Sequence, residues 1–118
     1  MTRIESLADA MLNGESLLLR SLLQDFIHEH PHLAAVQKPL TDDVETLAAA
    51  ASLLELLALR LQQQAPAWTN SIGALAEPIF LLKAATNMKR LRELCIAESP
   101  EPLRKRGFYA TPNYLEFA

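Results

Sequence analysis

The chain has little glycine, few aromatic residues and one cysteine. Its 118 residues include 3 Gly and 1 Cys, and 6% of them are aromatic. The cysteine, Cys95, excludes an internal disulfide and cannot form a metal site alone. We expect it to be a small buried side chain on a leucine-rich helix. Half of the residues are hydrophobic, mostly Leu and Ala. Because turn glycines and β-branched residues are scarce, this balance predicts an all-α fold.

Long apolar runs are also missing. No run reaches the roughly 18 residues that a membrane-spanning helix requires. Glu5 and Asp9 interrupt the region that would be apolar in a signal peptide. We therefore expect one cytoplasmic domain over residues 1–118, with no membrane partner.

The motifs of common enzyme classes are missing too. The sequence has no glycine-rich phosphate loop, no G-x-S-x-G and no H-E-x-x-H. Three histidines, at positions 28, 30 and 32, lie around Pro31, but no cysteine or carboxylate cluster completes a metal shell. The prediction is a protein that is not an enzyme and that holds no metal or cofactor.

Apolar residues recur at helical spacing in the first third of the chain. Asn13-Gly14 interrupts the pattern, because Gly costs about 1 kcal/mol against Ala in a helix. We expect a short helix, a turn, and a longer helix from about Glu15 to Glu29. Pro31 should end it, since the residue before a proline is pushed out of the helical conformation.

The next predicted helix runs from Asp42 to about Gln64. Asp42 should cap it, with Glu45 completing a capping box. Leu and Ala cover most of its sides, so the helix should be buried by more than one neighbour. It is the expected centre of a bundle of four or five helices, or a helix shared with a second subunit.

A further helix is predicted from Glu77-Pro78 to about Ala97, because Pro is favoured at the first helical position. Its inward residues should be Leu81, Ala85, Met88, Leu91 and Cys95. A last short turn should follow and end at Gly107, the position where helices commonly adopt a left-handed cap.

The C-terminal segment, residues 98–118, combines prolines, aromatic rings and a basic triplet. Rings bring large apolar area and prolines restrict the backbone, so this segment should lie ordered across a surface as a strap. The residues expected to supply its burial are Leu103, Phe108, Tyr109, Tyr114 and Phe117.

Charge is unevenly distributed. Residues 1–82 hold four Lys/Arg against ten Asp/Glu, whereas residues 83–106 hold seven Lys/Arg against three Glu. Two interpretations stay open. Both regions are solvated helix faces, or the asymmetry steers an acidic partner or lets the acidic end of one copy meet the basic end of another. Nucleic acid is a less favoured partner, because the net charge is −3.

Tryptophan, tyrosine and arginine dominate interface hot spots. The candidate interaction residues are Trp68, Lys89, Arg90, Arg92, Arg104, Lys105, Arg106, Tyr109 and Tyr114. Trp68 has an alternative role, in which it anchors its loop to the core through an indole N–H bonded to a carbonyl. The basic triplet, residues 104–106, is the part expected to be most free to meet a partner.

Several motifs carry a resemblance, which covers most of the chain from about residue 40. They are Leu54-Glu-Leu-Leu-Ala58, Pro66-Ala-Trp-Thr69, Glu77-Pro78, Met88-Lys-Arg-Leu-Arg92, Pro100-Glu-Pro-Leu-Arg104 and Pro112-Asn-Tyr-Leu115. With them the chain resembles a family of short, all-helical bacterial proteins. The Leu/Ala helix followed by Pro-Ala-Trp-Thr is similar to the helical part of antitoxin-like regulators, although no helix-turn-helix precedes it.

The resemblance implies a bacterial protein encoded beside a partner such as a nucleotidyltransferase-like toxin. Together with the residue patterns it predicts a non-enzymatic protein-interaction module, either the antitoxin-like half of a pair or a homodimer. The alternative is a small regulator that contacts nucleic acid through residues 83–106.

Overall fold

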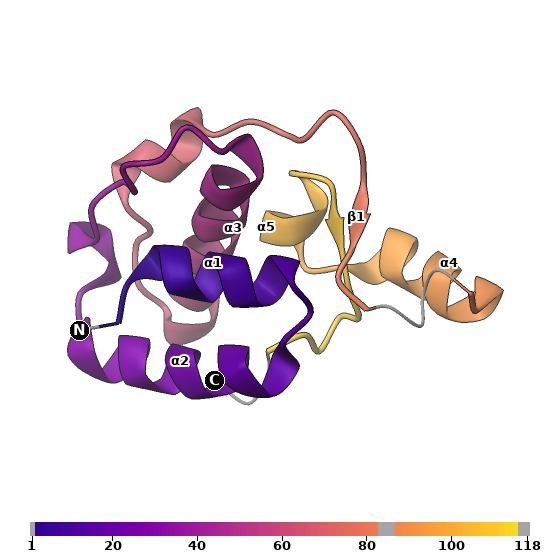
Figure 1. Ribbon diagram of the computed structural model, residues 1–118, viewed down its shortest axis with the longest axis horizontal. Helices are drawn as coiled ribbons and strands as arrows, with labels where there is room; N and C mark the ends of the chain where they lie inside the picture. The colour runs from indigo at the N-terminus through magenta and orange to yellow at the C-terminus, as the bar shows by residue number, and fades with distance from the viewer. Residues whose placement is uncertain (1, 83–86, 116–118) are drawn as a thin grey trace.

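A computed structural model describes residues 2–82 and 87–115 of the chain. Within these residues the protein is mostly helical, with a two-stranded parallel sheet at one side (Figure 1). The elements are α1 (Ile4–Leu12), α2 (Ser16–Glu29), the 3-10 turn η1 (Leu33–Ala35), α3 (Val44–Leu61), the 3-10 turn η2 (Ala67–Ser71), β1 (Ile79–Phe80), α4 (Lys89–Glu98), α5 (Glu101–Arg104) and β2 (Phe108–Tyr109). The all-α prediction is confirmed.

The predicted helical pair at the start of the chain is confirmed. α1 ends at Leu12, and Gly14 makes the turn into α2 with a φ of 72°. α2 ends at Glu29, two residues before Pro31. α1 packs against both α2 and α3, and α3 in turn packs against α5 and η2 (Figure 1).

α3 is the centre of the fold, as predicted. Its residues from Ala48 to Ala58 are buried except for the partly buried Glu55. Leucines from α1, α2, α3 and α5 meet around it in one hydrophobic cluster. Among the described residues, no helix combines the length and the apolar character needed to cross a membrane.

The start of α3 differs from the prediction. Asp43, not Asp42, caps the helix, and its carboxylate accepts hydrogen bonds from the Glu45 N–H and the Thr46 hydroxyl, both at 3.0 Å. With Asp43 as the cap, Thr46 is the third helical residue, so Glu45 is one position too early to complete a capping box. The N–H of Asp43 donates to the Thr41 hydroxyl at 3.2 Å. The sequence offered two adjacent Asp residues, and the Thr41 contact favours the second.

The helix predicted from Glu77-Pro78 to Ala97 is wrong in its first half. Ile79 and Phe80 instead form β1, which pairs in parallel with β2. The Ile79 N–H donates to the Gly107 carbonyl at 2.8 Å, and the Leu81 N–H donates to the Tyr109 carbonyl at 2.9 Å. These partners come from a segment far along the chain, so a local helical pattern did not reveal them.

Among the described residues of the predicted helix, α4 is the part that is helical. It extends from the rest of the molecule along the longest axis, 39 Å, and is labelled at the right of Figure 1. Of its predicted inward residues, Cys95 is buried, Leu91 is half-buried and Met88 is 57% exposed. Leu81, before the helix, is half-buried, and Ala85 lies outside the described residues.

The C-terminal segment packs onto the bundle as a strap over its described part. Leu103, Phe108 and Ala110 are fully buried, and Leu115 is nearly so. Gly107 ends the α5 turn with a φ of 93°, which confirms the predicted left-handed stop. Phe117 lies outside the described residues.

Candidate interaction surface

The most buried cation of the candidate set is Arg106. Its side chain is 2% exposed, and all five of its N–H groups have acceptors. Two reach the Glu55 carboxylate as a fork, at 2.7 and 2.9 Å. The other three reach backbone carbonyls of Ile72, Pro102 and Thr69, at 3.2, 3.3 and 2.8 Å. This guanidinium therefore joins α3, the η2 loop and α5.

Glu55 is matched to that cation. Burial raises the pKa of its carboxyl, but hydrogen bonds from Arg106 and Lys105 outweigh burial and lower the pKa from 4.5 to about 2. Lys105 approaches the same carboxylate at 2.6 Å with a side chain that is 46% exposed. Glu55 thus carries a full negative charge at neutral pH and pairs with two cations of the basic triplet, Lys105 and Arg106.

The prediction that the basic triplet is the segment most free to meet a partner is therefore wrong. Arg106 is enclosed and Lys105 is held by Glu55. Arg104 is exposed, but its guanidinium donates to the Ala97 carbonyl at the end of α4, at 2.9 Å. The triplet begins at the last residue of α5, so its side chains connect α5 with its neighbours rather than project together.

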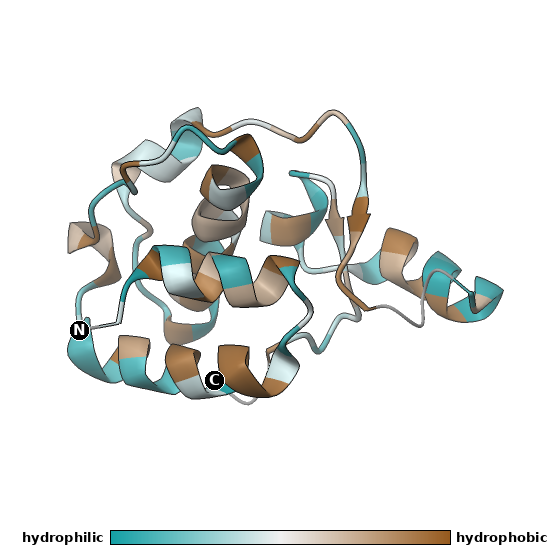
Figure 2. Cartoon of the chain, viewed as in Figure 1, coloured by the Kyte–Doolittle hydropathy of each residue, from teal (hydrophilic) through white to brown (hydrophobic). Residues whose placement is uncertain are grey.

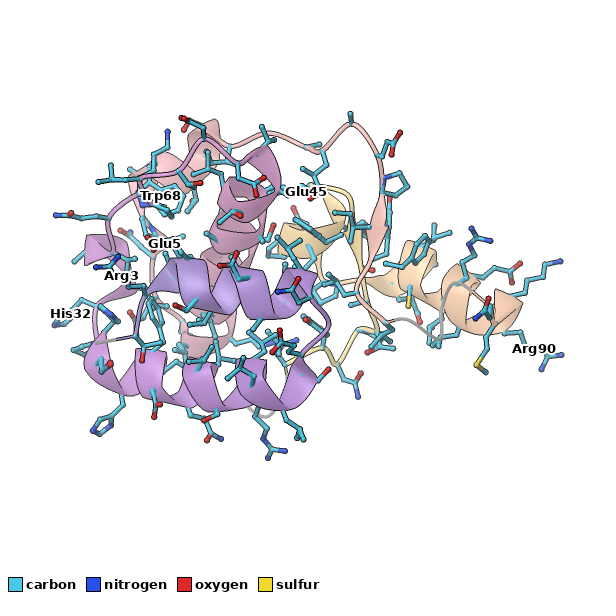
Figure 3. The ribbon with its side chains drawn as sticks, in the orientation of Figure 1. Arg3, Glu5, His32, Glu45, Trp68 and Arg90 are labelled. Carbon is cyan, nitrogen blue, oxygen red and sulfur yellow. The ribbon has the colours of Figure 1, made fainter. Side chains whose placement is uncertain are left out.

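The cations on α4 behave differently. Lys89, Arg90 and Arg92 are all exposed, and Arg90 points away from the body (Figure 3). Exposed apolar side chains accompany them: Met88 just before the helix, Leu94 at 38% and Ile96 at 47% exposure. Figure 2 shows hydrophobic and hydrophilic residues mixed along this helix. The combination is typical of a surface that buries apolar area and orients it with charge.

α4 is fixed to the body at defined contacts. The Arg92 guanidinium lies over the Phe80 ring of β1, 5.5 Å from its centroid. That ring also packs on Tyr109 of β2, with centroids 5.4 Å apart. At the other end, the buried Ser99 hydroxyl bonds to the carbonyl and the N–H of Ala110. Tyr109 is therefore a support for α4, half-buried rather than projecting.

Trp68 anchors its loop, as the alternative for this residue predicted. Its indole N–H donates to the Val36 carbonyl at 2.9 Å, and the ring packs on the hydrophobic cluster. The bond joins two irregular segments on the same side of α3 (Figure 3). Tyr114 is likewise half-buried against the cluster, and burial raises the pKa of its phenol.

A groove with an acidic rim was not found from the sequence. It lies between the first turn of α3 and the segment leading into β1, and its volume is about 440 Å³. It is lined by Val44, Glu45, Leu75, Ala76, Glu77, Pro78 and Ile79. Val44, the first residue of α3, is 64% exposed here. The two walls of the groove are distant in sequence. The only signal in the sequence that could have indicated the site is the group of acidic residues around Val44.

Groups with chemical reactivity are few in the described part of the chain. Cys95 is buried, and burial raises the pKa of its thiol. Within residues 2–82 and 87–115 no three His, Cys, Asp or Glu side chains group as metal ligands would. The His30 ring instead lies 3.3 Å from the Thr2 carbonyl and stacks on Phe26.

Comparisons with protein-family models, with curated proteins and with solved structures find no match to this chain. Its function is therefore inferred from the exposed face of α4 and from the groups that hold this helix in place.

Proposed function

We propose that this chain is a non-enzymatic protein-interaction module that binds its partner through α4. The observation that carries the proposal is the exposure of apolar side chains on a helix that projects from the body: Leu94 and Ile96 on α4, and Met88 just before it. The same helix presents the exposed cations Lys89, Arg90 and Arg92. A helix is a recurrent recognition element, and a partner that contacts α4 along one side can bury the exposed apolar side chain on that side, Leu94 or Ile96. The resemblance to antitoxin-like regulators favours a bacterial gene pair, with this chain as its antitoxin-like half, or a homodimer.

The body of the protein supports such a role. α3 and the Arg106–Glu55 pair hold the bundle together from inside, and α4 is oriented by the Arg92–Phe80 contact and the Ser99 bonds. A helix whose position is already set loses little conformational entropy on binding. The interaction energy should therefore come from the apolar residues, while the cations select an acidic partner.

Affinity capture tests this proposal. The tagged chain is used to capture proteins from a lysate of the bacterium that encodes it, beside a Leu94→Ser/Ile96→Ser variant. Leu17→Ser is the matched control, because Leu17 is 84% exposed on α2, away from α4. Capture should fall at least tenfold for the α4 variant and remain unchanged for the control. Equal capture by all three proteins would contradict the proposal.

A second candidate function is nucleic-acid binding through the same basic helix, favoured by the exposure of Lys89, Arg90 and Arg92. Three phosphate contacts would give a salt slope of roughly −2 to −3 in log K against log salt. Fluorescence anisotropy with labelled single- and double-stranded DNA and RNA between low and moderate salt measures it. Lys83, the start of the basic segment 83–106, lies outside the described residues.

A further inference from the structure

We propose that the acidic groove beside α3 is the docking site for α4 of a second copy of this chain. The proposal rests on the proposed function and names the partner of the same helix. The surface is self-complementary: each copy offers an acidic, apolar groove and a helix whose first half carries three exposed cations, followed by the exposed carboxylates Glu93 and Glu98. Two copies would exchange their helices across a two-fold axis, as isologous dimers do.

The chemistry of the groove matches that of the helix. Its floor and walls are apolar, from Val44, Leu75, Pro78 and Ile79. Glu45 and Glu77 line it as exposed carboxylates, and none of the described residues that line it is basic. Its volume of about 440 Å³ is many times the roughly 30 Å³ of a water molecule, so side chains can enter it.

Two more acidic residues directly precede the groove residue Val44 in the sequence. Asp42 and Asp43 are exposed immediately before Val44, and Leu40 is fully exposed on the same segment. Met88 and one of the pair Leu94 and Ile96, which lie on opposite sides of α4, are the side chains that this apolar surface would bury. Lys89 and Arg90 would then face the rim, which places opposite charges across the interface and fixes the register, while Arg92 stays on Phe80 of its own copy.

The placement of the two surfaces allows the exchange to be reciprocal. Ile79 lines the groove, and the next residue, Phe80, carries the ring on which Arg92 lies. Groove and α4 therefore belong to the same end of the molecule, the side of β1 in Figure 1. A two-fold axis near β1 would bring each α4 toward the groove of the other copy.

The area required also favours reciprocity. A stable interface covers roughly 800 Å² of each partner, which is a little over a tenth of this chain's 6956 Å². One ten-residue helix against one groove is a small contact, whereas two symmetric contacts double it. A dimer with both helices exchanged can reach the size of a specific interface.

Charge exchange between purified variants tests this inference. The first variant is Lys89→Glu/Arg90→Glu, which leaves the Arg92–Phe80 contact in place, and the second is Glu45→Lys/Glu77→Lys. Both variants and the unchanged protein are measured by sedimentation velocity over a concentration series. The unchanged protein should dimerise. Each variant alone reverses charge in both contacts of its dimer, so its dissociation constant should rise at least about tenfold. Far-UV circular dichroism and melting temperature report whether each variant is folded.

Mixing the two variants is the decisive measurement. In a mixed dimer one contact pairs a reversed helix with a reversed groove, and the other pairs the two original surfaces. Association should return to within a fewfold of the unchanged protein, a recovery that misfolded variants cannot give. Leu17→Ser is the control that should leave the dimer intact.

Three results would overturn the inference. They are a monomeric unchanged protein at every concentration, a Glu45→Lys/Glu77→Lys variant that dimerises normally, and a mixture that stays monomeric. The second result would place the contact elsewhere, for example helix on helix. A monomer that still captures a lysate protein in an α4-dependent manner would refute the homodimer and leave the proposed interaction function standing.

Discussion

Glu55→Gln removes the negative charge that holds Arg106, and its cost can be estimated from the structure. The pKa of Glu55 is lowered from 4.5 to about 2, and each pKa unit corresponds to about 1.4 kcal/mol, which sets an upper value near 3 kcal/mol. Because Lys105 is half exposed, solvent screens its part of the interaction. We therefore expect a loss of about 2–3 kcal/mol at pH 7, within reach of the loss seen when a buried ion pair loses one partner.

The direction of the pKa shift of Glu55 determines how the cost of Glu55→Gln changes with pH. A carboxyl whose pKa is depressed by folding stabilises the protein above its unfolded pKa, near 4.5, and this contribution is lost as the pH falls through about 2. Roughly half or more of it should be gone at pH 3. The difference in free energy of unfolding between the unchanged protein and Glu55→Gln should therefore shrink between pH 6 and pH 3.

Urea unfolding followed by circular dichroism at several pH values measures that difference. Lys105→Gln is the matched control, because it removes only the exposed partner of Glu55 and should cost less than about 1 kcal/mol. A Glu55→Gln cost below about 0.5 kcal/mol at pH 7 would refute a stabilising role for the Glu55–Arg106 pair. So would a larger cost that does not change with pH.

Three further substitutions test single contacts by thermal or urea unfolding. Trp68→Phe removes the donor to the Val36 carbonyl and should destabilise by about 1–2 kcal/mol; a neutral result would mean that water replaces the indole N–H. Ser52→Ala should stabilise by about 1 kcal/mol, because the buried Ser52 hydroxyl has no partner among the described residues and Ala is the better helix former; destabilisation would reveal an acceptor. Asp43→Ala should cost about 1 kcal/mol and Asp42→Ala almost nothing, and the reverse order would restore Asp42 as the cap.

The helices that the sequence predicted well are those whose signals are local. Gly14 lies between two apolar stripes and Pro31 follows the second, so the bounds of α1 and α2 can be derived from neighbouring residues. α3 is recognisable because Leu and Ala cover most of its sides. In each case many of the apolar side chains whose spacing predicts the helix are also the side chains that are buried.

The errors arose where a distant segment decides the local structure. Glu77-Pro78 has the form of a helix start, yet Ile79 bonds to the Gly107 carbonyl and begins a strand. Parallel pairing of this kind depends on residues far along the chain, and no periodicity within the segment reports it. The acidic groove was missed for the same reason, since Glu45 and Glu77 become neighbours only in the fold.

In the basic segment, residues 83–106, contacts within the protein reduce the number of cations that are available to a partner. The sequence groups its cations together, but Arg106 and Lys105 share Glu55 and Arg104 reaches the end of α4. Three exposed cations on α4 then remain among the described residues of the segment, which is few for a phosphate backbone and sufficient to orient a helix on a rim of carboxylates. These contacts also help to hold α4 in its outward position. Lys105 and Arg106 connect α5 to α3, and Arg104 connects α5 to α4. Because Arg106 and Lys105 are engaged by Glu55, the specificity of this surface depends on the exposed cations of α4 and on the carboxylates that we propose they meet.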